Sequence, residues 1–382
     1  MPHSPPPHSP PPLSPPPLSP PRRDSHALTV VLLAGAIAAW QAAPLGAWPL
    51  ASLAVAASLG WAFVASGLSF TAAFRAWQQA GEGARLATLL LIPAVAAVVV
   101  LPMSNLVPGY GAAVAPPGIG VAVGAAIFGL GMQLANGCGS GTLAAAGAGA
   151  PRMWIVLPWF CAGGVFGSLA LPAIQRLPTP PAFGWSDLLG PWGGLAVTLA
   201  LLGALAAILL RGGQRPGIAQ LRAPLLVGAL AAVLFLVTGT PWGITSGLTL
   251  WGGKLAVALG VPLADTPYWA EAGAREALAG PLLANTSSRT NIGMILGAAA
   301  CAAWQGRLRR QPWPSRAGMA AAVLGGVLMG FGARLSFGCN IGAFVGGVAS
   351  GSLHGFLWFA AVLPGSWLGI RLRPRFGLSR TA

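Results

Sequence analysis

Charged residues are scarce in this 382-residue chain. They make up 7% of it, whereas apolar residues make up 55% and the mean hydropathy is +0.72. Soluble domains carry about a quarter charged residues, so a soluble fold could not cover its surface with the charges available here. The sequence therefore predicts an all-α, polytopic membrane protein.

Acidic residues are the rarest of the charged types. Carriers coupled to protons or sodium often use carboxylates inside the membrane, and no acid here falls within a long apolar run. This favours facilitated passage, or a coupling that uses other groups. Basic residues give a net charge of +15 and lie at the ends of apolar runs rather than in one patch, as the positive-inside rule requires, so no nucleic-acid partner is expected. The six acids are Asp24, Glu82, Asp187, Asp265, Glu271 and Glu276.

Cysteine is also sparse, with four residues and no pair or His cluster at zinc spacing. We therefore expect neither a metal site nor another cofactor. Cys161 and Cys301 lie among small apolar residues, which indicates core packing. Cys138 and Cys339 lie instead within a repeated motif.

Ten apolar runs have the length of a membrane span, which is about 20 residues. If the basic connections face the cytoplasm, the spans alternate without conflict, and both termini lie inside the cell at the inner membrane. His354, at the outer end of the last run, is interpreted as an interfacial residue. The runs cover 27–43, 48–66, 85–101, 117–136, 152–172, 190–210, 223–240, 291–306, 317–337 and 352–372.

The two ends of the chain differ from the apolar body. Residues 1–21 repeat Pro-Pro-Pro with Ser, His and Leu between, which predicts a Pro-rich disordered tail over 1–26, with a misassigned start codon or a docking segment as further interpretations. The predicted body divides into a first repeat at 27–189 and a second at 190–372, followed by a basic tail at 373–382.

The division into halves follows from a repeated motif. Gly129–Gly141 and Gly330–Gly342 share the pattern G-[LF]-G-x-[QR]-L-x-x-G-C-x-x-G, 201 positions apart (339 − 138). In the predicted topology, the spans before the two cysteines run in opposite directions. A second pair of similar segments, 65–70 and 245–250, lies 180 positions apart. Because the cysteine motifs lie 201 positions apart, the second half holds 21 extra residues between its two segments (201 − 180). We assign them to an outer loop or surface helix at 261–290. We therefore predict two inverted five-helix repeats.

The glycines of the motif should break the helices near the membrane midplane. Glycine leaves helical geometry easily, and broken helices at membrane depth occur only where they line a cavity or are buried in protein. Their free N–H groups favour an anion. The alternative is that these glycines serve close helix packing and that each cysteine is a small buried side chain.

Basic residues near the predicted breaks also point to an anion path. Arg75 and Lys254 follow the second pair of segments, and Arg334 lies inside a span; Arg75 is alternatively a cytoplasmic anchor. A thiol with a pKa of about 8.5 stays protonated at neutral pH and can donate to a soft sulfur atom. The predicted path consists of Cys138, Cys339, Ser69, Thr249, Gly137, Gly338, Asn136, Asn340, Arg334, Arg75 and Lys254.

The chain resembles the YeeE/YedE (sulfur transport) family over roughly residues 45–372. The resemblance rests on Gly131-x-x-Leu-x-x-Gly-Cys-x-x-Gly141, on its counterpart at 332–342, and on Ser66-Gly-Leu-Ser-Phe-x-x-Ala-Phe-Arg75. It implies a channel-like, inverted-repeat transporter in which thiosulfate passes from Cys138 to Cys339 through S–H···S contacts. The thiosulfate members carry a third cysteine where this chain has Ser69, which leaves the sulfur anion open.

Two further functions fit the same residues. One is a membrane relay that passes persulfide to a small soluble sulfur-carrier (TusA-like) protein, which the resemblance suggests as a partner. The other is a general anion channel. None of the three readings is that of an enzyme.

Overall fold

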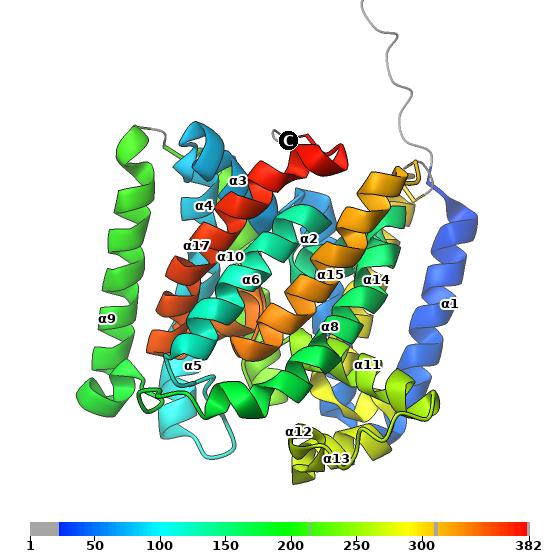
Figure 1. Ribbon diagram of the computed structural model, residues 1–382, viewed down its shortest axis with the longest axis horizontal. Helices are drawn as coiled ribbons and strands as arrows, with labels where there is room; N and C mark the ends of the chain where they lie inside the picture. Colours follow the sequence, from blue (N-terminus) through cyan, green and yellow to red (C-terminus); the bar gives the residue numbers. More distant parts are fainter. Residues whose placement is uncertain (1–22, 214, 309–311, 380–382) are drawn as a thin grey trace, which may run out of the picture.

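The computed structural model describes residues 23–213, 215–308 and 312–379, and every element named in them is helical (Figure 1). The first half contains α1 Ser25–Ala42, α2 Ala47–Ser66, α3 Phe70–Ala80, α4 Gly83–Leu89, α5 Leu91–Leu106, α6 Ile119–Ala135, α7 Gly139–Gly147 and α8 Pro151–Gln175. The second half contains α9 Trp185–Leu209, α10 Ile218–Thr238, α11 Thr245–Ala258, α12 Pro267–Ala270, α13 Ala272–Ala279, α14 Thr286–Trp304, α15 Arg316–Leu335, α16 Gly347–Ala349 and α17 Leu353–Leu372. Short 3₁₀ turns (η1 Ala43–Leu45, η2 Leu210–Gly212, η3 Leu282–Ala284, η5 Arg373–Phe376) and a π-helix, η4 Asn340–Gly346, complete the described chain.

Nine helical stretches in the described ranges are long and apolar enough to cross a membrane. They match nine of the ten predicted runs, and the polytopic all-α prediction is confirmed. The tenth run forms α14, a 19-residue helix that starts five residues earlier than predicted. Its first turns carry the buried polar residues Ser288, Arg289 and Asn291, which lower its hydropathy below that of a typical span.

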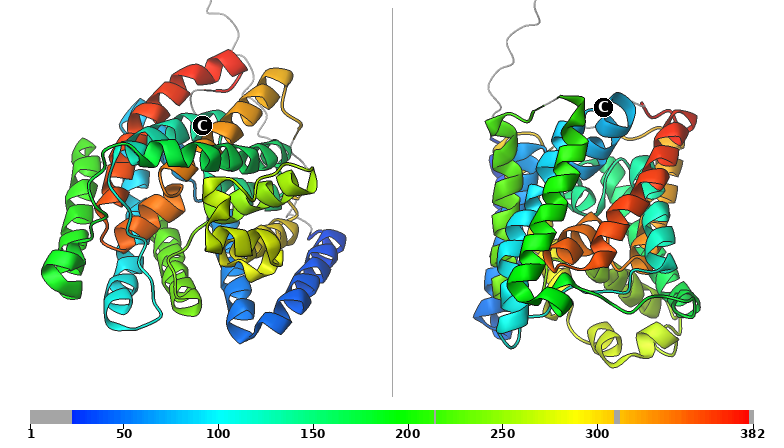
Figure 2. Two further views of the ribbon diagram at one scale, coloured as in Figure 1. Left: turned by 60° about the horizontal axis from the view of Figure 1, so that its bottom comes forward. Right: turned by 90° about the vertical axis from the view of Figure 1, so that its left-hand side faces the viewer.

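The order of elements in the first half recurs in the second. A long helix (α1, α9) precedes a helix that breaks into a short one (α2–α3, α10–α11). Then follow a further long helix (α5, α14), a second broken pair (α6–α7, α15–η4) and a last long helix (α8, α17). Packing partners are exchanged in the same way: α6 packs on α17 and α15 on α8, while α2 packs on α14 and α10 on α5. Helices α1 and α9 form opposite flanks, seen in Figures 1 and 2.

Different short helices lie at the two ends of the molecule. In Figure 1, α3 and α4 lie at the top, near the C-terminus, whereas α11 to α13 lie at the bottom. Residues 261–290, predicted as an outer loop or surface helix, form α12, α13, the turn η3 and the first five residues of α14.

Most of the predicted N-terminal tail, residues 1–22, lies outside the described residues. Helix α1 already begins at Ser25, capped by the Asp24 carboxylate, which accepts from the Ala27 N–H at 3.0 Å. The predicted boundary at 189/190 falls inside α9, at a kink where Gly190 has φ 69°. The predicted basic tail starts with the turn η5, in which Arg373 is buried.

Candidate functional site

The two motif cysteines occupy the same position in two helix breaks. Cys138 is the residue before α7, and Cys339 is the residue before η4. Each preceding helix ends with left-handed backbone, at Asn136 (φ 64°) after α6 and at Phe337 (φ 59°) after α15. Both cysteines are buried, with 1% and 0% of their surface exposed. Each thiol is thus held at the N-terminal end of a helix inside the protein.

The two breaks are in contact. A Cβ built on Gly139 would lie 2.8 Å from the Sγ of Cys339 and 3.7 Å from a methyl carbon of Ile244. Gly139 directly follows Cys138, so the second thiol rests against the backbone that carries the first. Only glycine leaves room for this approach.

The Cys138 thiol faces the N-terminus of α7. Its Sγ accepts the N–H of Gly141 at 3.4 Å and lies 3.4 Å from the Ser140 hydroxyl. Free N–H groups and the positive end of the helix dipole lie in this turn. The arrangement can hold a polarisable group or an anion beside the thiol.

The turn after Cys339 is a π-helix, in which the Phe344 N–H reaches the Cys339 carbonyl at 3.3 Å. π-turns are rare and frequently mark functional sites. Asn340 begins this turn, fully buried, and neither its Oδ1 nor its Nδ2 has a hydrogen-bond partner in the described chain. The Thr142 hydroxyl, in the first turn of α7, is also buried without a partner. Such groups cost free energy unless a ligand satisfies them.

The four glycines of each motif divide into two functions. The first two serve helix packing, as in the alternative reading. A Cβ on Gly131 would lie 2.8 Å from the Gly325 carbonyl of α15, and a Cβ on Gly332 would lie 2.5 Å from the Gly124 carbonyl of α6. The later glycines lie in the breaks, where Gly338 has φ 153° and only Gly adopts the conformation readily.

The Ser-Gly-Leu segments occupy different positions in the two halves. Ser69 caps α3, accepting the Ala72 N–H at 3.2 Å, and lines a cavity of about 540 Å³ with Arg85 and Arg222. Thr249 instead lies inside α11 and packs against Gly164 of α8. The second-half break lies earlier, between Gly239 (φ 72°) and Ile244, because the chain leaves α10 at that left-handed glycine.

The basic residues predicted for the path divide between the two ends. Arg75 donates from Nη1 to Asn136 Oδ1 at 2.9 Å, two residues from Cys138. Lys254 donates to the Leu278 and Gly280 carbonyls at 2.7 and 2.6 Å, which fastens α11 to the end of α13. The guanidinium of Arg334 lies over the Tyr268 ring of α12, 3.9 Å from its centroid. The structure therefore brings Arg75 and Asn136 together beside Cys138 and directs Lys254 and Arg334 to the α12–α13 hairpin.

Three residues near the breaks were not predicted for the site. Arg152 and Arg373 donate to carbonyls at the C-terminal end of α6, three to five residues before Cys138. His354 is buried rather than interfacial. Its Nδ1 lies 2.8 Å from the Ser352 hydroxyl, and it fits against Gly347, beyond the π-turn. The sequence offered a signal only for Arg152, a lone base after the first motif.

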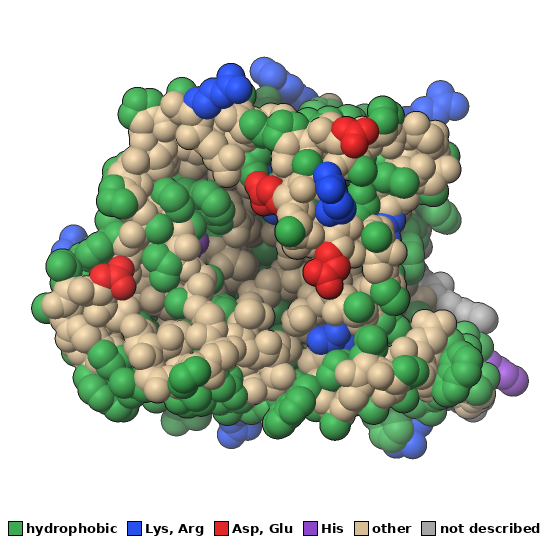
Figure 3. All heavy atoms as spheres, turned by 90° about the horizontal axis from the view of Figure 1, so that it is seen from below, with side chains coloured by type: hydrophobic (Ala, Val, Ile, Leu, Met, Phe, Trp, Pro, Cys, Tyr) green, Lys and Arg blue, Asp and Glu red, His purple; other side chains and the backbone are tan. Residues whose placement is uncertain are grey.

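The bottom face of the molecule is hollowed. Figure 3 shows acidic side chains gathered on this face around a central depression. Four of the six acids, Asp187, Asp265, Glu271 and Glu276, belong to the connections and helices between α8 and α14. The basic side chains of Arg75, Arg152 and Arg373 lie instead at the end of the molecule that carries α3 and η5.

Comparison with known proteins identifies the relatives of this chain. The profile of the family described as sulphur transport matches residues 65–368. The probable transporter YedE of Escherichia coli is 35% identical over 153 residues, which is 40% of this chain and 37% of that protein. The thiosulfate transporter TsuA of Spirochaeta thermophila is 28% identical over 65% of this chain and 76% of its own length, and TsuA of E. coli is 26% identical over 66% and 73%.

The match to YedE spans little more than a third of that protein, whereas the family profile covers most of this chain and both cysteine motifs. The chain belongs to the sulphur transport family of membrane proteins.

Proposed function

We propose that this protein carries thiosulfate or a related sulfur-containing anion across the inner membrane, past Cys138 and Cys339. The observation that carries the proposal is the contact between the two breaks, where the Cys339 Sγ lies against Gly139. Two protonated thiols and two helix N-termini meet there. The TsuA relatives are named for thiosulfate, which supports this choice of anion.

The thiols favour sulfur over oxygen ligands. Each S–H is a weak donor whose soft sulfur suits the terminal sulfur of thiosulfate, while the N–H groups of α7 attract the negative charge. The unpartnered amide of Asn340 adds one donor and one acceptor at the same point. A substrate is thus passed from one thiol to the other without a covalent bond.

The proposed path requires that the two halves are inverted in the membrane, with both termini in the cytoplasm. The exchanged packing partners and the placement of the half-helices α3 and α11 at opposite ends support this arrangement (Figure 1). Ser69 then lies on the cytoplasmic side, in the cavity with Arg85 and Arg222, where a small soluble sulfur-carrier protein could receive the anion.

The test is uptake of ³⁵S-thiosulfate, and growth on thiosulfate, in a bacterium that lacks its own sulfur-anion transporters. Cys339→Ala should abolish uptake. Cys301→Ala is the matched control, because Cys301 is equally buried but lies within the helix α14, outside the two breaks. If wild-type protein reaches the membrane and moves no sulfur anion, the proposed function is wrong.

A second measurement separates passage from the relay. Thiols are trapped during turnover and analysed by mass spectrometry. Hydrogen-bonded passage predicts no persulfide on either cysteine, and it predicts partial uptake by Cys138→Ser, since a hydroxyl also donates. A stable persulfide on Cys138 or Cys339 would establish the relay instead.

A further inference from the structure

Three arginines from distant parts of the chain meet at the C-terminal end of α6. Arg152 donates to the Leu134 and Ala135 carbonyls at 2.5 and 2.9 Å, and Arg373 donates to the Gln133 carbonyl at 2.7 Å. Arg75 and Arg373 both donate to Asn136 Oδ1, at 2.9 and 3.1 Å. Asn136 itself is exposed and lies two residues before Cys138. These four residues are called the arginine cluster below.

The charge of the arginine cluster is unmatched among the residues that the structure describes. Arg75 and Arg373 are buried, with 4% and 3% of their surface exposed. The charged neighbours of Arg373 are Arg75 and Arg152, and none of the three has a carboxylate partner in the described chain. Buried cations without a counter-charge are expensive and mark functional sites in membrane proteins.

Helix capping accounts for only part of this charge. The C-terminal end of a helix carries about half a negative charge, whereas the cluster brings three positive ones. Capping also leaves Arg75 unexplained, because it donates to the Asn136 side chain and to no α6 carbonyl. An excess of about two and a half positive charges therefore remains for a ligand.

The orientation of the Asn136 amide indicates where such a ligand binds. Its Oδ1 accepts from two guanidinium groups, so the Nδ2 points away from them on an exposed residue. Neither N–H of this Nδ2 has a hydrogen-bond partner in the described part of the chain. Guanidinium and amide donors around one point match the oxygens of a tetrahedral oxyanion.

We propose that Arg75, Arg152, Arg373 and Asn136 bind the oxygen end of a tetrahedral divalent oxyanion, at the turn that leads into Cys138. Resting on the proposed function, this assigns two ends of one substrate to two recognition sites: the cluster contacts the oxygens, and the thiols contact the terminal sulfur. The cluster by itself does not distinguish sulfate from thiosulfate. Sulfate therefore binds at the cluster and competes with thiosulfate there, although the thiols do not pass it on.

The test is a binding measurement that needs no transport. The full chain is placed in nanodiscs of phosphatidylcholine, and binding of ³⁵S-sulfate is measured together with the rise in melting temperature that sulfate causes. Wild type should bind sulfate saturably. Losing one charge-assisted bond, worth about 1.5–3 kcal/mol, weakens binding roughly ten- to hundredfold. Arg75→Gln and Asn136→Gly should each show this loss. Both should fold, since the hydrogen bond that Arg75 donates in the described chain goes to a side chain, and glycine tolerates the left-handed backbone of Asn136.

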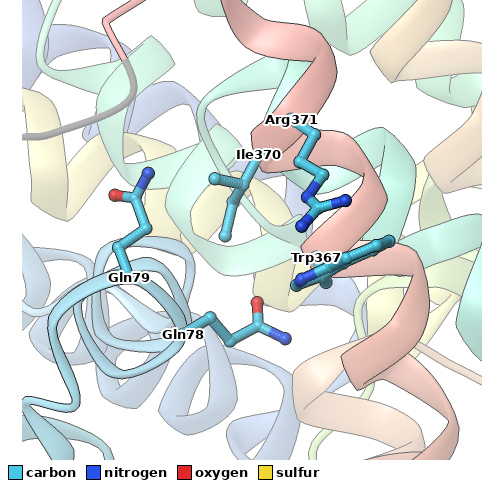
Figure 4. Close-up of a pocket in the computed structure, with 5 residues that line it drawn as sticks. All are labelled: Gln78, Gln79, Trp367, Ile370 and Arg371. Atoms are coloured by element: carbon cyan, nitrogen blue, oxygen red, sulfur yellow. The ribbon is translucent and has the colours of Figure 1, made fainter.

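Arg371→Gln is the matched control. Arg371 lies two residues from Arg373, but it is exposed and lies along the Trp367 ring, 3.6 Å from its centroid (Figure 4). It should bind sulfate as wild type does. If Arg75→Gln and Asn136→Gly also bind sulfate as wild type does, or if wild type binds none, the cluster is not an oxyanion site.

Two further arms separate the remaining outcomes. The double variant Cys138→Ala with Cys339→Ala should keep sulfate binding and lose thiosulfate uptake. If wild type binds sulfate through the cluster but takes up no sulfur anion, the proposed function is wrong and the oxyanion site stands. Nanodiscs with anionic lipid test the other source of a phosphate-like group. If sulfate binding disappears in them, and phosphatidylglycerol protects the chain only while Arg75 is present, the cluster holds a lipid headgroup and the proposal is overturned.

Discussion

Gly139→Ala tests the contact between the two breaks directly. The new Cβ would lie 2.8 Å from the Cys339 Sγ and 3.4 Å from its Cβ. Non-bonded carbon atoms are at their optimum about 3.5–4.0 Å apart, so the sulfur contact is short by roughly 0.7–1.2 Å. Either the Cys339 side chain or the start of α7 must move. Added methyl groups in packed interiors cost about 1–3 kcal/mol, and we expect a loss of stability of this size.

Function should suffer more than stability in this variant. The displaced atom is the Sγ proposed to receive the substrate, and a misplacement of about 1 Å can reduce a rate about a hundredfold. The assay is ³⁵S-thiosulfate uptake, with the melting temperature of the purified protein measured in parallel. Gly141→Ala is the control in the same turn, because its Cβ would meet only the Cys138 Sγ, at an ordinary 3.5 Å.

A double variant identifies the cause. In Gly139→Ala with Cys339→Ala the sulfur is removed, so most of the lost stability should return while uptake remains absent. This interaction between the two substitutions is measured by a double-mutant cycle. If Gly139→Ala melts and transports like wild type, the two thiol-bearing turns do not touch and do not form a shared site.

Three further variants separate stability from transport. Asn340→Ala should reduce uptake strongly and leave the melting temperature unchanged or higher, because it removes two buried unpartnered atoms, each costing about 1–3 kcal/mol; a large drop in stability would contradict this. Gly338→Ala should destabilise the protein by about 2 kcal/mol or more, since its φ is 153° and a Cβ would clash with the Ala343 nitrogen, whereas Gly342→Ala, which meets only a carbonyl at 3.8 Å, should melt as wild type does. Arg289→Gln should lower the melting temperature without changing the KM for thiosulfate, because Arg289 ties α14 to Ser52 of α2 and to the Leu283 carbonyl, both at 2.7 Å; a raised KM would show that this arginine also meets the substrate.

Several features of the fold could be predicted because they depend on local composition. Apolar runs of about 20 residues are set by the thickness of the bilayer, and nine of the ten predicted runs became long apolar helices. The repeated Gly-Cys-x-x-Gly core marked the two breaks, because each preceding helix ends in left-handed backbone directly before the first glycine of that core, at Asn136 and at Phe337. The run at 291–306 was placed late because the polar first turns of α14 are buried by neighbouring helices, which the sequence does not display.

The similarity between the two Ser-Gly-Leu segments predicted the second pair of breaks less well. The Ser-Gly-Leu likeness aligned Ser69 with Thr249, yet Ser69 caps a helix and Thr249 lies within one. The left-handed turn at Gly239 had moved the break several residues earlier. Short likenesses of this kind cannot specify where a chain leaves a helix.

The sequence by itself determined a helical membrane protein with two buried cysteines, each at the start of a broken helix. Tertiary structure alone decided which side chains accompany those cysteines. Lys254 and Arg334, close to the breaks in sequence, turn to the α12–α13 hairpin. Arg373, 237 positions from Asn136, reaches it instead. The reason is physical: a glycine break fixes where the backbone turns, but which arginine lies at that turn depends on how helices from both halves cross.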